Sequence, residues 1–91
     1  MTEKEQLREQ IEVMEAIERL YENKDFILVI LNKYLNDECA KAIKLSTYPT
    51  QNKDEHIAKA QAAGYLEQYL TNTVIIGKKA KEDIVDLYQS N

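Results

Sequence analysis

Apolar residues recur every three or four positions over most of the chain, with polar residues between them. This spacing places the apolar residues on one face of an α-helix. It predicts three helices, at about residues 3–22, 24–46 and 53–89, joined after the second by a loop at residues 47–52 that contains Pro49. The predicted fold is therefore all-α: a single domain, residues 1–91, built as an antiparallel hairpin or elongated bundle with a long C-terminal helix.

The first predicted helix has one apolar face and a strongly acidic remainder. Thr2 precedes it and Glu5 follows three residues later, which is the pattern of a capping box. Glutamates occupy most of the outer positions, which is typical of a helix face in water. The apolar stripe, which Val13 and Leu20 widen, consists of Leu7, Ile11, Met14, Ile17 and Tyr21.

A polar stretch at residues 23–25 separates the first two helices. Asn23 is a favourable N-cap, and Asp25 places negative charge at a helix N-terminus. No Gly or Pro lies here, so one continuous helix through residue 23 is the alternative. Residues 26–31 are apolar on every side and alone resemble a buried strand. Helical spacing then continues for several turns and favours a helix, with apolar positions at Ile27, Leu31, Tyr34, Leu35, Cys39, Ala42 and Ile43.

The third predicted helix begins after Asn52, which forms another capping box with Glu55. We expect one long helix, and the alternative splits it near residues 71–77, where β-branched residues precede Gly77. The predicted apolar stripe consists of Ala62, Leu66, Tyr69, Thr73, Ile76, Ala80, Ile84 and Leu87.

The formal net charge of −4 lies at one end of the chain. Residues 1–22 carry seven glutamates and three basic residues, whereas residues 23–91 carry nine of each sign. The only basic cluster, residues 78–81, is followed at once by Glu82 and Asp83. Nucleic-acid and membrane-surface binding need a clustered basic face, so we expect neither.

The chain offers little catalytic or metal-binding chemistry. Cys39 is the only cysteine, so no disulfide forms within the chain, and it falls on an apolar stripe. His56 follows Asp54 and Glu55 directly, and consecutive helical residues point in different directions, so these three do not converge on a metal. We expect no enzyme and no cofactor. The polar, acidic start also predicts no signal peptide.

Two segments are candidate protein contacts. The helix at residues 26–31 is apolar all round and must be covered on every side. The tyrosines at 65 and 69 lie one helical turn apart, and tyrosine suits interfaces because one end is apolar and the other forms hydrogen bonds. We therefore expect self-association or docking through a set of residues that comprises Phe26, Val29, Ile30, Tyr65, Tyr69 and Leu70.

The segment from Ile17 to Leu31, followed by Tyr34-Leu35 and Asp37-Glu38-Cys39-Ala40, resembles short helical proteins of tailed bacteriophages. Their pattern is a leucine-rich helix, Asn-x-Asp-Phe, an apolar helix, Tyr-Leu, and acidic residues before Ala; the later Gly77 also fits it. Residues 11–45 carry the resemblance, from which Cys39 departs. These proteins commonly lie among virion and head-assembly genes, so the resemblance implies a setting and no catalytic or binding residues.

The resemblance implies a non-enzymatic accessory protein of the phage particle or its assembly, found in the virion or the host cytoplasm. Its partners are then itself or other phage structural proteins, contacted through helices. Two alternatives remain: a small acidic regulator that binds a host protein through its first helix, and a small terminase-like subunit for DNA packaging.

Overall fold

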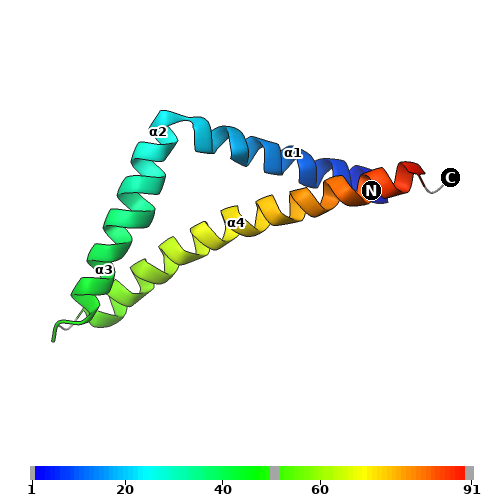
Figure 1. Cartoon of the computed structure of the whole chain (residues 1–91). Helices are drawn as coiled ribbons and strands as arrows, with labels where there is room; N and C mark the ends of the chain where they lie inside the picture. The colour runs from blue at the N-terminus through cyan, green and yellow to red at the C-terminus, as the bar shows by residue number, and fades with distance from the viewer. Residues whose placement is uncertain (1, 50–51, 90–91) are drawn as a thin grey trace. The chain divides into compact units, whose positions relative to one another are not determined.

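The computed structural model describes residues 2–49 and 52–89, and these residues form helices joined by short turns (Figure 1). The chain divides into two compact units that share the last helix. The terminal unit comprises Met1–Glu22 and Leu70–Asn91, and the hairpin unit comprises Asn23–Tyr69. The elements in chain order are α1 (Glu3–Glu22), α2 (Lys24–Phe26), the π-helix η1 (Ile27–Glu38), α3 (Cys39–Ser46) and α4 (Lys53–Gln89). The all-α class is confirmed.

The polar residues that precede the first and second predicted helices, Thr2 and Asn23, act as caps. The amide of Glu5 donates to the Thr2 hydroxyl at 3.2 Å. The side-chain oxygen of Asn23 accepts from the amides of Asp25 and Phe26, both at 3.0 Å. Asn23 has an extended backbone conformation, with φ −80° and ψ 119°. The chain therefore turns here, and the alternative of one continuous helix through residue 23 is wrong.

The second predicted helix, residues 24–46, consists of α2, η1 and α3 in direct succession. In η1 the backbone hydrogen bonds widen to the i→i+5 spacing of a π-helix, which usually occurs only as single-turn bulges. At its end the amide of Cys39 donates to the carbonyls of Tyr34 and Asn36. The half-buried residues of this stretch are spaced four apart in two rows, and the wider turn of a π-helix keeps each row on one face. One row is Phe26, Ile30 and Tyr34, and the other is Ile27, Leu31, Leu35 and Cys39.

The last helix, α4, runs without a break through Gly77, so the predicted single helix is confirmed and the split is wrong. Its buried face differs from the predicted stripe at three positions. Ala63, Leu70 and Gly77 are buried, whereas Ala62, Tyr69 and Ile76 are exposed. The stripe that replaces the predicted one has positions three and four residues apart in alternation, and it consists of Ala63, Leu66, Leu70, Thr73, Gly77, Ala80, Ile84 and Leu87. The other half-buried positions of the helix are His56, Ile57, Ala60, Val74 and Asp83.

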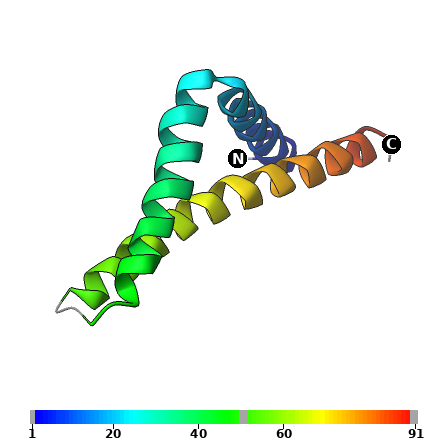
Figure 2. The ribbon, with the colours of Figure 1, turned by 60° about the vertical axis from the view of Figure 1, so that its left-hand side comes forward.

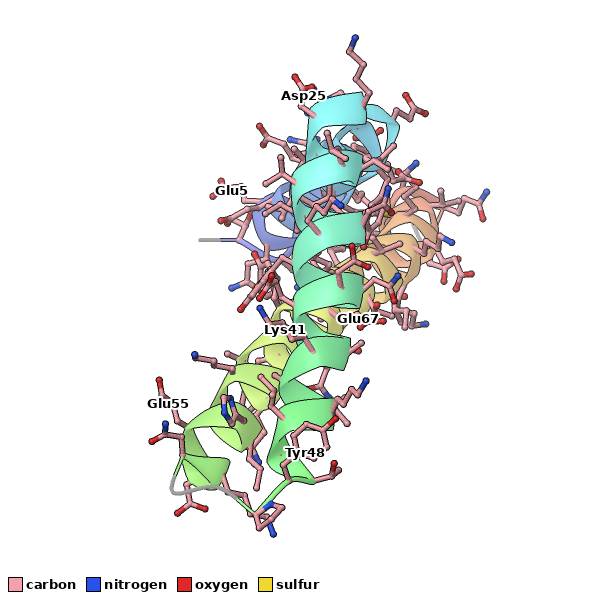
Figure 3. All side chains as sticks on the ribbon, turned by 90° about the vertical axis from the view of Figure 1, so that its left-hand side faces the viewer. Glu5, Asp25, Lys41, Tyr48, Glu55 and Glu67 are labelled. Atoms are coloured by element: carbon pink, nitrogen blue, oxygen red, sulfur yellow. The ribbon has the colours of Figure 1, made fainter. Side chains whose placement is uncertain are left out.

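In the hairpin unit, α3 lies beside the start of α4, and η1 and α2 then diverge from α4 (Figures 1 and 2). The buried residues of this unit are Ala42 and Ala63, both small. The Cys39 thiol donates to the Ala60 carbonyl at 3.9 Å across the pair. Figure 3 shows Tyr48 and Asp25 at opposite ends of the helix that forms one arm of this hairpin.

In the terminal unit, α1 packs on the second half of α4 (Figure 1). The core consists of Leu7, Met14, Ile17, Leu70 and Ala80, and the described residues include no buried polar side chain. Gly77 allows the closest approach: a Cβ at this position would come within 2.7 Å of the Met14 Cγ and Sδ, and closer still to its Cβ. The helices therefore touch where one of them has no side chain.

Candidate protein-interaction surface

The segment Phe26–Leu31 contains six consecutive apolar residues, and none of them is buried. Phe26 and Ile30 are half-buried, whereas Val29 is 56% exposed and Leu28 is 52% exposed. The first helix turns of the hairpin unit thus present adjacent large aliphatic side chains to water. Such a patch is typical of a protein contact, because isolated exposed apolar residues are common but a cluster is not.

The predicted tyrosine face is exposed on α4. Tyr65 is 73% exposed, and Tyr69, one turn later, is 58% exposed. Leu70 does not belong to this face: it is only 5% exposed and packs in the core of the terminal unit. A helix rotates by about 100° per residue, so the neighbour of an exposed tyrosine points inward. The candidate contact on α4 therefore consists of Tyr65 and Tyr69 without Leu70.

A groove of about 470 Å³ lies between the two arms of the hairpin unit. Its floor is formed by small side chains, among them Ala42 and Ala63, which leave space between the helices. Most of the other lining residues have larger side chains. The lining residues are Tyr34, Glu38, Cys39, Lys41, Ala42, Leu45, His56, Lys59, Ala62 and Ala63.

The structure brings Cys39 and His56 to this same groove, although a loop separates them in the sequence. Within the described residues no hydrogen bond joins them: the Cys39 thiol donates instead to the carbonyl of Ala60. A nucleophilic cysteine needs a base within hydrogen-bond reach to become a thiolate. The groove does not have that arrangement.

Acidic side chains are numerous, but in the part of the chain that the structure describes they are not gathered into a metal-binding cluster. Residues 2–49 and 52–89 include no group of three or more His, Cys, Asp and Glu side chains placed to hold a metal ion. The glutamates of α1 all lie exposed, and Figure 3 shows one of them, Glu5, at the surface. The same ranges include no helix with the length and apolar character needed to cross a bilayer.

Two lysines of the basic cluster have carboxylate partners. Lys79 lies 3.1 Å from Asp83, one turn along α4, and Lys81 lies 3.9 Å from Glu15 of α1. The hydrogen bond and charge of Asp83, with a smaller effect of Glu82, raise the pKa of Lys79 above its ordinary value of 10.5. Two of the three lysines of the cluster, Lys79 and Lys81, thus lie beside a carboxylate in space as well as near acidic residues in the sequence.

Sequence reasoning did not identify several exposed aliphatic residues. Leu28 and Ile75 are more than half exposed. Ile43 and Ile76 were predicted on the apolar stripes of their helices, and both lie at the surface. Seven-residue spacing does not distinguish the two faces of α4, because the exposed Ala62, Tyr69 and Ile76 have the same spacing as the buried Ala63, Leu70 and Gly77.

Comparisons of the chain with models of protein families, with curated proteins and with solved structures find no match.

Proposed function

We propose that the protein is a non-enzymatic accessory component of a bacteriophage particle or of its assembly, and that it acts through helix-mediated contacts with other proteins. The observation that carries the interaction role is the segment Phe26–Leu31, in which no side chain is buried although all six are apolar. The phage setting rests on the sequence resemblance of residues 11–45.

Burial of this segment supplies the driving force for docking. Covering a large aliphatic side chain contributes about 1.5–3 kcal/mol relative to leaving it in water. Val29 and Leu28 are adjacent and both more than half exposed, so one partner surface covers both. The partner that fits is an apolar helix face of another structural protein, because the patch itself carries no charge.

The tyrosines of α4 provide a second contact of different chemistry. Tyr65 and Tyr69 are spaced one turn apart on an exposed face. Their rings bury apolar area at low cost in side-chain entropy, and their hydroxyls form hydrogen bonds at the edge of an interface. This combination favours recognition of a specific protein over non-specific aggregation.

Mass spectrometry of purified particles and of their assembly precursors tests the setting. We expect the protein in at least one of these fractions at a fixed ratio to the major structural proteins. Its absence from both would contradict the proposal. Recovery with a single host protein through α1, or a salt-sensitive complex with DNA, would instead support the regulator or the packaging subunit.

Substitution tests the surface. Val29→Asp places a charge in the aliphatic patch, and we expect it to weaken capture of the partner because the carboxylate must be desolvated. The matched control is Asn32→Asp, which places the same charge at an exposed polar position one turn further along. Equal loss with both variants, or with neither, would contradict a contact at Val29.

A further inference from the structure

The two edges of the terminal unit differ in charge. Along one edge, basic side chains join α1 to α4: Lys81 lies 3.9 Å from Glu15, and the Arg8 guanidinium donates to the Tyr88 hydroxyl. The Lys4 ammonium lies 4.5 Å from the centre of the Tyr88 ring, which adds a cation–π contact. The basic groups at this edge therefore contact partners within the chain.

The opposite edge, called the open edge below, carries carboxylates. A groove of about 470 Å³ runs between α1 and α4 there, and its lining includes Val13, Ile76 and Glu9. Asp83 follows Ile76 by seven residues, which is about two helical turns, so a second hollow continues the same edge. This hollow has a volume of about 420 Å³ and is lined by Glu3, Asp83, Asp86 and Leu87.

The acidic lining of the open edge is not balanced by basic residues. The groove contributes one carboxylate and the hollow three, and within the described residues no basic side chain lines either of them. Lys79 lies 3.1 Å from Asp83 and offsets that carboxylate. The other three, Glu3, Glu9 and Asp86, form no ion pair within residues 2–49 and 52–89. The open edge thus carries uncompensated negative charge.

Apolar side chains form the other part of the open edge. Val13 is 37% exposed and Ile76 is 48% exposed. They line the groove from opposite helices, so one side chain seated in the groove contacts both. Leu20 is also exposed and lies seven residues after Val13, which places it on the same flank of α1. The open edge is therefore apolar towards Leu20 and acidic towards Glu3.

We propose that the open edge binds a basic amphipathic helix of another protein. A helix fits by shape, because a third helix packs into the groove between two packed helices, as in helical bundles. Its aliphatic residues cover Val13 and Ile76, and its lysines or arginines lie beside the carboxylates. The inference goes beyond the proposed function, which assigns contacts to residues 26–31 and to the tyrosines at 65 and 69.

Charge selects this partner over others that could cover the open edge. A second copy brings a chain with a net charge of −4, and duplex DNA brings phosphates, so the carboxylates repel both. A wholly apolar partner would remove water from the carboxylates without offering them a base, which is costly. A partner that has both aliphatic and basic residues avoids these penalties.

A synthetic peptide provides the probe. It has about 18 residues, which make five helical turns, and its leucines share one face while its lysines share the other. A control peptide has the same composition in an order without an apolar face. Fluorescence anisotropy with the purified full chain measures binding. We expect a dissociation constant of about 10–100 µM for the amphipathic peptide, about tenfold weaker binding of the control peptide, and weaker binding at higher salt.

Paired substitutions of acidic residues test where the charge acts. Glu9→Gln/Asp86→Asn removes two carboxylates of the open edge, and we expect about three- to tenfold weaker binding, because each exposed ion pair contributes modestly. The matched control, Glu18→Gln/Glu22→Gln, removes two exposed carboxylates outside the groove and the hollow. It should change the affinity by less than about twofold, since salt screens distant charges. Equal losses would show general attraction to an acidic chain and would overturn the site.

Two neighbouring isoleucines test the apolar part. Ile76 lines the groove, whereas Ile75 is 59% exposed and is not among the lining residues. We expect Ile76→Gln to weaken binding by about fivefold or more, because the partner loses the apolar surface that it covers. Ile75→Gln should change it by less than about twofold. Circular dichroism confirms that each variant folds, and equal effects of the two variants would contradict the groove.

The remaining outcomes separate this inference from the proposed function. No binding of the amphipathic peptide at about 100 µM, or equal binding of both peptides, would overturn the inference. A wild-type dimer that Ile76→Gln dissociates would place a second copy in the groove and overturn it too. Val29 belongs to the hairpin unit, so a loss of peptide binding in Val29→Asp would move the contact to residues 26–31. Presence in particles tests the proposed function independently of these results.

Discussion

At the scale of single residues, the two glycines of α4 have opposite roles. A Cβ at Gly77 would collide with the Met14 side chain, whereas a Cβ at Gly64 would meet nothing within 4 Å. Gly77 therefore serves close packing of α1 on α4, and Gly64 is an ordinary helix position. Glycine inside a helix costs about 0.5–1 kcal/mol relative to alanine, so only Gly77 offsets that cost with a contact.

Alanine at each glycine is expected to have opposite effects on stability. Gly64→Ala should raise the free energy of unfolding by about 0.5–1 kcal/mol, since the helix gains propensity without a clash. Gly77→Ala should lower it, because overpacking costs about 1–3 kcal/mol and outweighs that gain. Urea unfolding followed by circular dichroism measures both. A Gly77→Ala protein as stable as Gly64→Ala would contradict the close contact with Met14.

The pair Lys79–Asp83 makes a prediction about titration. Asp83→Asn should lower the pKa of Lys79 towards 10.5, because the carboxylate is both its hydrogen-bond partner and its strongest charge. Glu82→Gln should lower the pKa less, since Glu82 acts through charge alone. NMR titration of the lysine side chains measures both shifts. Equal shifts in the two variants would contradict the hydrogen bond.

The sign of the linked effect on stability follows from the direction of this shift. The folded pKa of Lys79 is raised, so its contribution is fully present below the ordinary pKa of 10.5 and is lost as the pH rises through the folded value. The loss of this contribution is confined to alkaline solution, and the contribution itself is small because the pair is exposed on a helix surface.

At the scale of elements, the start of the second helix depends on one side chain. The first amides of a helix have no partner within it, and Asn23 satisfies two of them. The turn at Asn23 also separates α1 from α2 without Gly or Pro. An N-cap is thus sufficient here to end one helix and begin the next.

Removal of this cap should destabilise the protein. Asn23→Ala is expected to lower the free energy of unfolding by about 1 kcal/mol, as replacement of N-caps generally does. Asn23→Asp is the control and should retain most of the stability, because its carboxylate accepts the same two amide hydrogens. Chemical unfolding measures both variants. If alanine and aspartate are equally stable, the cap does not determine where this helix begins.

The buried face of α4 shows why the sequence stripe was displaced at three positions. Hydrophobicity alone favours Tyr69 and Ile76 as core residues, yet both are exposed. Gly77 lies inside because a close helix pair needs a small residue at its nearest point, and Leu70, seven residues earlier, lies on the same face. A glycine carries no hydrophobic signal, so residue-by-residue reasoning assigns it to no face.

At the scale of the whole molecule, the excess negative charge lies on residues 1–22, and two lysines of the only basic cluster have carboxylate partners. Lys79 and Lys81 each lie within 3.9 Å of a carboxylate. The glutamates of α1 are exposed. Phosphate binding requires several unpaired cations on one surface.

We therefore predict no measurable binding to duplex DNA at physiological salt. A gel-shift titration measures this, and the double variant Glu82→Lys/Asp83→Lys is the positive control because it turns residues 78–83 into a basic run. We expect the variant to bind at low salt. Micromolar, salt-sensitive binding by the wild-type chain would favour the packaging subunit.

The sequence by itself determined the fold class, the ranges of the three helical segments and the caps at Thr2 and Asn23. These features depend on periodicity and on local hydrogen bonds, which a few neighbouring residues decide. The apolar segment at residues 26–31 was also visible from its composition, whereas the sequence did not show which of its side chains are exposed.

Only the tertiary structure decided which residues the helices bury against each other. It moved Leu70 from the candidate interface to the core and placed Gly77 against Met14. It also showed that Tyr88 and Lys81 contact one edge of α1, while the other edge lines a groove. Such contacts depend on the distance and rotation between two helices far apart in the chain, and short-range sequence patterns do not specify either quantity.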